Sequence, residues 1–154
     1  MGHTEKQGKA YAFRLLSIKD RTKTELTERM QKKGFEEGII TNVIQYMMHL
    51  GYIDDKKYAT HFAEMRAKYD KFGPHRILTE LLKRGIEKCM AETVVKDVFP
   101  EGRELSNALS LANDWVARQN TTDKDRTKRR LYGYLARRGF DSSVIISTLM
   151  EVLD

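Results

Sequence analysis

The sequence predicts an all-α protein, an elongated tandem array of three three-helix repeats. Of its 154 residues, 32% are charged and 40% hydrophobic, a balance typical of soluble helical proteins, and we find no Val- and Thr-rich alternation of the kind that forms strands. One short phrase also occurs three times, with an apolar residue, two basic residues, a glycine and an apolar residue. It reads MQKKGF around Gly34, LLKRGI around Gly85 and LARRGF around Gly139.

The three glycines lie 51 and 54 residues apart, which is the length of a small supersecondary unit repeated in tandem. We therefore predict a disordered N-terminus or cloning remnant at residues 1–9, followed by three repeats of three helices each. The predicted repeats span residues 10–52, 53–100 and 101–154.

Apolar residues recur at the same offsets from each glycine, which predicts one helix that ends there and another that follows. Four and eight residues before the glycines, and one residue after them, every position is apolar. Nine and ten residues after them, the pairs are Val43/Ile44, Val94/Val95 and Thr148/Leu149.

Each glycine is expected to form a tight corner between these two helices, because a left-handed residue often ends a helix and glycine adopts that conformation without strain. The basic pairs that precede the corners suit the partial negative charge of a helix C-terminus. Acidic residues follow each corner and suit the N-terminus of the next helix. The repeated phrase thus has a structural explanation.

A further helix is predicted at the start of each repeat, at Ala10–Ile18, Asp54–Tyr69 and Glu104–Arg118. Asp54 and Asp55 are expected to cap the second of these, and Pro74 to lie in the first turn of the helix that follows it.

Four local features complete the predicted architecture. The polar run at residues 118–125 predicts an exposed, mobile loop. Gly133 stands inside a helix and indicates close helix packing. Cys89 is expected to be a small buried side chain. The aromatic residues are assigned to the cores, because most of them lie on apolar stripes, and they are Tyr11, Phe13, Tyr52, Tyr58, Phe62 and Trp115.

Composition limits the class of protein. A single cysteine suits a reducing compartment and no run is long and apolar enough to span a bilayer, so a cytoplasmic protein is expected. The four histidines show no metal-ligand spacing, and neither a phosphate-binding loop nor a nucleophile turn is present. We expect no catalytic residues, no metal and no cofactor, and therefore no enzyme.

Three segments resemble the RecX family of recombination regulators: GYIDDKKYATHF at residues 51–62, FGPHRILTELLKRGI at 72–86 and RRLYGYLARRGFDSSVI at 129–145. The resemblance covers about residues 11–153. It implies an all-helical protein of three-helix repeats that binds the RecA nucleoprotein filament and restrains its ATPase and strand-exchange activities. No particular contact residue is implied, and we expect a monomer.

Basic residues concentrate on the predicted middle helices. The formal net charge is +6, and the segment Lys124–Arg138 holds seven basic residues and one acidic residue, whereas Gly139–Asp154 holds no Lys or Arg. A sequence-specific helix-turn-helix reader is disfavoured, because the candidate recognition helix at residues 36–50 carries no Lys or Arg. Non-specific binding to the DNA backbone, without a protein partner, stays open as the alternative.

Arginine is the expected contact residue, because its planar fork pairs with carboxylate and phosphate alike. The predicted partner- or DNA-binding residues are Arg76, Lys83, Arg84, Arg126, Arg129, Arg130, Arg137 and Arg138.

Overall fold

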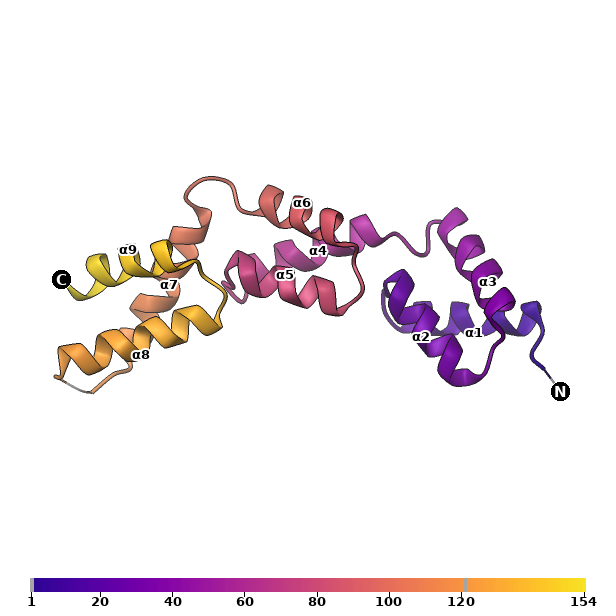
Figure 1. Cartoon of the computed structure of the whole chain (residues 1–154), viewed down its shortest axis with the longest axis horizontal. Coiled ribbons are helices and arrows are strands. Elements are labelled where there is room, and N and C mark those ends of the chain that lie inside the picture. Colours follow the sequence, from indigo (N-terminus) through magenta and orange to yellow (C-terminus); the bar gives the residue numbers. More distant parts are fainter. Residues whose placement is uncertain (1, 121) are drawn as a thin grey trace.

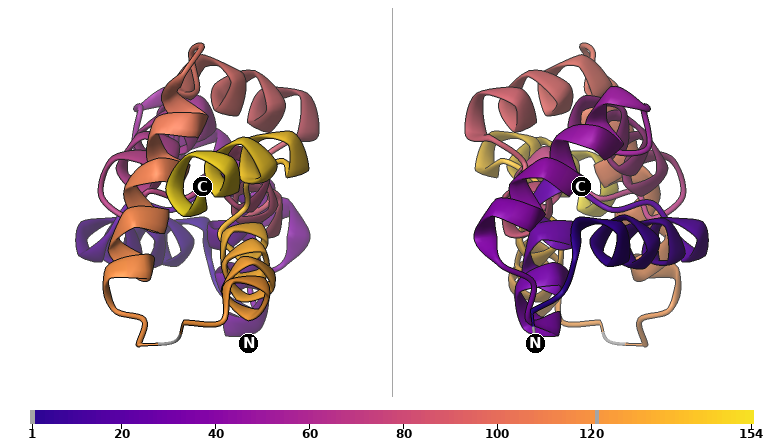
Figure 2. Two further views of the ribbon diagram at one scale, coloured as in Figure 1. Left: turned by 90° about the vertical axis from the view of Figure 1, so that its left-hand side faces the viewer. Right: turned by 90° about the vertical axis from the view of Figure 1, so that its right-hand side faces the viewer.

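The computed structural model describes residues 2–120 and 122–154, and within them the chain is all helical. Over residues 2–120 and 122–154, nine helices follow one another along an extended molecule with the termini at its two ends (Figure 1). Seen end on, the three units lie behind one another (Figure 2). The described helices are α1 (Glu5–Ile18), α2 (Lys23–Lys33), α3 (Glu37–His49), α4 (Asp55–Lys68), α5 (Pro74–Lys83), α6 (Lys88–Val98), α7 (Arg103–Ala117), α8 (Lys124–Arg137) and α9 (Ser142–Leu153).

The helices pack in threes, and each group of three encloses its own core. The main helix pairs all fall within α1–α3, α4–α6 or α7–α9, and the buried apolar residues form three separate clusters. These groups are called repeats 1, 2 and 3 below. The predicted fold class, three tandem three-helix units, is confirmed.

Each repeat contains the predicted glycine corner between its second and third helices. Gly34, Gly85 and Gly139 have φ of 97°, 84° and 96°, which is the left-handed region that side chains resist. The amide that follows the glycine bonds to a carbonyl five residues earlier, as Phe35 N does to Met30 O at 3.1 Å. The apolar residues on either side of each corner are buried, as in a Schellman motif.

Side chains start the helices where the sequence indicated. Asp54 Oδ1 accepts a hydrogen bond from Lys57 N at 3.1 Å, and Pro74 is the first residue of α5, where its missing N–H leaves no bond unmade. The predicted N-terminal boundary is wrong, because α1 begins at Glu5. A reciprocal capping box between Thr4 and Gln7 stabilises that start.

Several local predictions also need correction. Cys89 is exposed, because it is out of phase with the buried stripe of α6. Phe13 and Tyr52 are 39% and 56% exposed, so they are not core residues. Among the described residues, no neighbouring helix packs against Gly133, and a Cβ there would meet only the guanidinium of Arg137, at 3.2 Å.

The other four aromatic side chains assigned to the cores are partly buried against them: Tyr11, Tyr58, Phe62 and Trp115. The predicted loop at residues 118–125 includes residue 121, which lies outside the described residues. Its last two residues already belong to α8, which begins at Lys124.

The repeats meet through their middle helices, which follow one another end to end as α8, α5 and α2 (Figure 1). At the joint between repeats 1 and 2, Thr22 Oγ1 donates to Arg84 O at 2.7 Å and Thr24 Oγ1 donates to Gly85 O at 3.2 Å. Two carbonyls just past the end of α5 are thus satisfied by hydroxyl groups at the start of α2.

The joint between repeats 2 and 3 is built in the same way from backbone amides. Gly73 N donates to Arg138 O at 2.8 Å, and His75 N donates to Gly139 O at 3.0 Å. A Cβ on Gly139 would lie 2.4 Å from Arg76 N. The corner glycine of one repeat is therefore also the point where the preceding repeat approaches most closely.

Candidate protein and nucleic-acid interface

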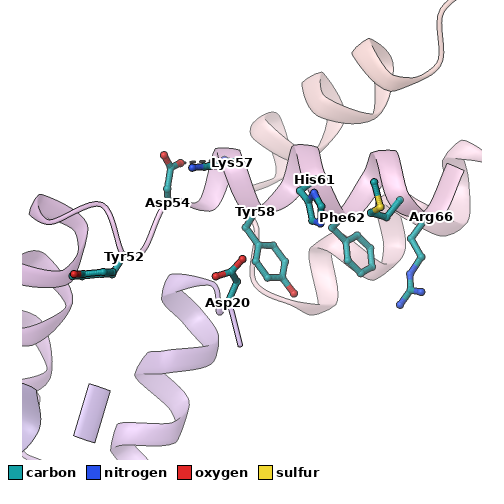
Figure 3. Close-up of a pocket in the computed structure, with 9 residues that line it drawn as sticks. Asp20, Tyr52, Asp54, Lys57, Tyr58, His61, Phe62 and Arg66 are labelled. Carbon is teal, nitrogen blue, oxygen red and sulfur yellow. Dashed lines mark hydrogen bonds between the residues drawn. The ribbon is translucent and has the colours of Figure 1, made fainter. Parts of the chain in front are cut away.

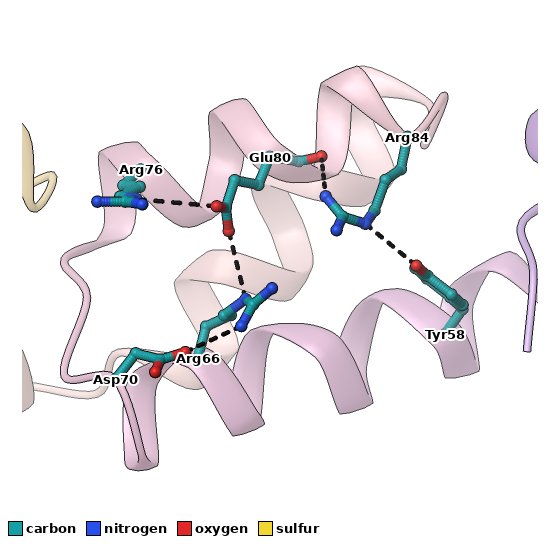
Figure 4. Close-up of polar contacts among 6 residues, drawn as sticks. All are labelled: Tyr58, Arg66, Asp70, Arg76, Glu80 and Arg84. Atoms are coloured by element: carbon teal, nitrogen blue, oxygen red, sulfur yellow. Dashed lines mark hydrogen bonds and ion pairs between the residues drawn. The ribbon is translucent and has the colours of Figure 1, made fainter. Parts of the chain in front are cut away.

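Repeat 2 presents a row of arginines between α4 and α5 (Figure 4). Glu80 lies at its centre, with Oε1 at 3.7 Å from Arg76 Nε and Oε2 at 3.5 Å from Arg66 Nε. Arg66 also pairs with Asp70 at 3.0 Å. Farther along α5, Arg84 Nε donates to the hydroxyl of Tyr58 at 3.1 Å. Two carboxylates thus neutralise part of the charge of this row.

Aromatic rings support the same guanidinium groups. Arg76 lies over the ring of Phe72 at 3.9 Å, and Arg84 and Arg66 lie over the ring of Phe62 at 4.3 and 4.8 Å. Arg138 of repeat 3 reaches the other side of the joint and lies 5.6 Å from Phe72. Cation–π contacts of this kind hold a guanidinium in one place while leaving its N–H groups directed outward.

Tyr58 remains a neutral hydroxyl at the edge of this row. Burial raises its pKa above the ordinary value, and the negative charge of Glu25 in α2 acts in the same direction. The phenol can therefore accept the hydrogen bond from Arg84 without ionising near neutral pH. Arg84 and Tyr58 form a contact between α5 and α4 next to the first joint.

A hollow of about 520 Å³ opens beside this row, between repeat 1 and α4 (Figure 3). Tyr58, Phe62 and Arg66 border both features. The rest of its lining mixes aromatic, acidic and basic groups and comprises Asp20, Tyr52, Asp54, Lys57, His61 and Met65. The hollow carries no dominant charge, so it favours neither an anionic nor a cationic ligand.

The arginines of repeat 3 have a different environment. Arg129, Arg130 and Arg137 line a hollow of about 380 Å³ together with Trp115 and Gln119. Within the described residues, no carboxylate lies within ion-pair distance of these three guanidinium groups.

The structure divides the predicted contact residues into two groups. Arg76, Arg84 and Arg138 belong to the stacked row, while Arg129, Arg130 and Arg137 line the hollow of repeat 3. Lys83 and Arg126 are exposed on the middle helices. Their roles in binding stay predictions.

The sequence did not identify two residues of these candidate binding surfaces, Arg66 and Trp115. Arg66 lies on a first helix rather than a middle helix, and its spacing of four from Phe62 was the available signal. Trp115 was assigned to a core, yet its partly buried ring also lines the hollow of repeat 3. Only the packing of α7 against α8 places the indole beside the arginines.

Glu64 and Asp141 are among the carboxylates outside these groups whose pKa is lowered. Hydrogen bonding from Arg103 lowers the pKa of Glu64, and the two side chains form a bidentate pair at 2.8 and 3.2 Å across repeats 2 and 3. Hydrogen bonds from Ser143 lower the pKa of Asp141, with a smaller contribution from His75. Glu64 thus lies at the joint between repeats 2 and 3, and Asp141 lies at the start of α9.

In the described ranges, 2–120 and 122–154, no cluster of three or more His, Cys, Asp or Glu side chains could hold a metal ion. Among the same residues, no helix is long and apolar enough to cross a membrane.

The fold and these surfaces define a class, a tandem helical-repeat protein with cationic middle helices. Family models describe each unit: the first, second and third three-helix domains of RecX match residues 9–47, 54–95 and 103–149. The chain therefore belongs to the RecX family.

Individual relatives agree over nearly the whole length. The chain is 29% identical over 149 residues to regulatory protein RecX of Mycobacterium sp. (strain KMS), covering 94% of this chain and 81% of the relative. It is 30% identical to regulatory protein RecX of Mycolicibacterium smegmatis, covering 91% and 76%. The crystal structure of RecX from Lactobacillus salivarius superposes with a TM-score of 0.82 at 21% identity, covering 96% of both chains, and so supports the fold.

Proposed function

We propose that this chain is a regulatory protein that binds the RecA nucleoprotein filament and lowers its ATPase and strand-exchange activities. The observation that carries the proposal is the joined pair of cationic middle helices α5 and α8, in repeats 2 and 3, on a chain that belongs to the RecX family along its length. Relatives in the family are named regulatory protein RecX, which supports a regulatory role.

The geometry suits a filament as partner. The predicted contact residues are distributed over repeats 2 and 3, and the stacked row reaches across the joint between them through Arg138 and Phe72. An elongated molecule with contacts on two units can bridge neighbouring subunits of a filament. Bridging would oppose the subunit movements that hydrolysis and strand exchange require, so binding and inhibition should occur together.

The test is DNA-dependent ATP hydrolysis by RecA, measured together with co-sedimentation on preassembled filaments. We expect the protein to sediment with the filaments and to lower hydrolysis in proportion to the amount bound. The double substitution Arg129→Glu with Arg130→Glu should weaken both effects in parallel. A matched control is Arg29→Glu with Lys32→Glu, which changes the same charge on exposed positions of α2. Full hydrolysis at saturating protein would refute the proposal.

The second candidate is a non-specific DNA-binding protein without a dedicated protein partner, and the high net positive charge favours it. Salt separates the two candidates. The logarithm of the affinity for bare DNA should fall linearly with the logarithm of the salt concentration. The slope should be about −0.9 per phosphate contact on duplex DNA and about −0.7 on single strands. Filament binding should persist at salt concentrations that abolish binding to bare DNA, because apolar burial is screened less. Equal affinities and slopes for both targets would favour the second candidate.

A further inference from the structure

We infer that the hollow between α7 and α8 is a binding site for single-stranded nucleic acid, in which Trp115 contacts an unstacked base and Arg130 and Arg137 bind the adjoining phosphates. The inference does not depend on the proposed function, because the site would bind a free strand in the absence of any filament.

The arginines of this hollow differ from those of repeat 2 in their counter-charges. The guanidinium groups of Arg66 and Arg76 in repeat 2 have carboxylate partners, whereas those of Arg130 and Arg137 have none among the described residues. Cationic side chains that converge without a counter-charge attract an anionic ligand, and the planar arginine fork matches the oxygens of a phosphate.

The geometry of α8 places two of these arginines on the same side of the helix. Arg130 and Arg137 are seven residues apart on α8, and therefore on one face and about 10 Å apart along the axis. Gly133 lies between them and lines the hollow with its bare backbone. A Cβ at this position would come within 3.2 Å of the Arg137 guanidinium. Because Gly133 has no side chain, this face of α8 leaves space for the side chain of Arg137.

Contacts on the core side hold the indole of Trp115 in place. Trp115 is stacked on Tyr134, with ring centroids 6.2 Å apart and planes inclined by 27°, so its position is fixed from the side of the core. Gln119 Nε2 donates to Trp115 O at 3.2 Å, which holds the amide against the end of α7. An aromatic surface among phosphate-binding groups is the arrangement by which proteins bind single strands.

These features favour a single strand over the other polyanions. The bases of a duplex are stacked on one another and are not free to stack on an indole that lines a hollow. An acidic protein would satisfy the arginines but would leave the aromatic surface without a matched partner. The combination of base and phosphate contacts is specific to an unpaired nucleotide chain.

The chain contains one tryptophan, so its fluorescence reports this site directly. We would titrate the full chain with an oligothymidylate, with an abasic strand of equal length and with the corresponding duplex. The oligothymidylate should quench the emission saturably and bind about tenfold more tightly than the abasic strand, because base stacking contributes that much to affinity. Heparin and polyglutamate should compete poorly at equal charge.

Variants assign the binding residues by anisotropy of a labelled oligothymidylate. Arg130→Gln with Arg137→Gln should lower affinity by about tenfold for each charge-assisted hydrogen bond that the substitutions remove. The same pair of substitutions should also make the plot of log affinity against log salt concentration shallower by about 1.4. Each of the two lost phosphate contacts contributes about 0.7 on a single strand. The control Arg29→Gln with Lys32→Gln removes equal charge from exposed positions of α2 and should leave affinity and slope nearly unchanged. Trp115→Leu should weaken binding, and Trp115→Phe should restore most of it.

Three results would overturn the inference: unchanged tryptophan emission at saturating oligothymidylate, equal affinity for the abasic strand, or an equal effect of the control pair and the arginine pair. Competition by polyglutamate at the same charge concentration would instead assign the hollow to an acidic protein. Circular dichroism melting of every variant shows whether the fold is kept, and the wild-type comparison of strands needs no variant at all.

Discussion

The joint between repeats 2 and 3 makes a sharp prediction for Gly139→Ala. A Cβ on Gly139 would lie 2.4 Å from Arg76 N and 2.9 Å from Arg76 Cα, and backbone atoms cannot move aside as a flexible side chain can. The substitution should push the two repeats apart. It should also break the hydrogen bonds that Gly73 N and His75 N donate across the joint.

Gly34→Ala is the matched control, because Gly34 has nearly the same φ, 97° against 96°, and among the described residues no other repeat packs against it. The nearest atom to its added Cβ would be His3 Nε2 at 3.8 Å. The left-handed conformation alone costs an alanine about 1 to 2 kcal/mol. Overpacking at Gly139 adds about 1 to 3 kcal/mol, and each broken hydrogen bond about 1 kcal/mol. With two hydrogen bonds broken, we therefore expect Gly139→Ala to destabilise the protein by about 4 to 7 kcal/mol.

Urea unfolding followed by two probes measures this effect. Far-ultraviolet circular dichroism reports all three repeats, and the fluorescence of Trp115 reports repeat 3. In a repeat protein the interfaces between neighbours couple the units, so Gly139→Ala should separate the fluorescence transition from the circular dichroism transition. Gly34→Ala should also lower stability. It should not separate the two transitions, because it leaves the joint between repeats 2 and 3 intact. Equal destabilisation by both substitutions, with coincident transitions, would refute the reasoning.

Other predictions address single contacts. Leu135→Ala removes a fully buried side chain and should cost about 2 to 5 kcal/mol in urea unfolding, whereas Ile146→Ala, 52% exposed on α9, should cost within about 0.5 kcal/mol. Asn107→Ala should cost about 1 to 3 kcal/mol, since its amide donates to a repeat 2 carbonyl at 2.9 Å; thermal melting unchanged from wild type would contradict this. Arg103 lowers the pKa of Glu64 below 4.5, so their pair should stabilise the fold fully above that pH and lose its effect as the pH falls through the lowered value. Glu64→Gln should therefore be less stable than wild type at neutral pH, and the difference should shrink in acid.

Much of the fold is local in origin and could be predicted from the sequence. The corner at Gly34 depends on residues within one helical turn of it, because left-handed geometry, the flanking apolar contact and the basic pair are all short-range effects. The same reasoning found the cap at Asp54 and the first-turn position of Pro74. It failed at Cys89 because a single residue beside a stripe can be buried or exposed according to the exact rotation of the helix.

The candidate sites depended on contacts between distant residues. Composition and spacing indicated that the middle helices carry the charge, and this holds for Arg130 and Arg137 in the structure. Whether an arginine has a counter-charge could not be predicted in this way. Arg76 finds Glu80 within its own helix, but Arg66 meets the same carboxylate from another helix, and such a pairing exists only once α4 and α5 have packed.

The sequence by itself determined three helical units, their corners and the excess of positive charge on the middle helices, since periodicity, capping and helix dipoles act over a few residues. The tertiary structure alone decided that the units join end to end through their glycine corners and that Trp115 lies beside Arg130 and Arg137. Those features depend on which helix faces meet and how closely backbones approach, and both are set by packing between segments far apart in the chain.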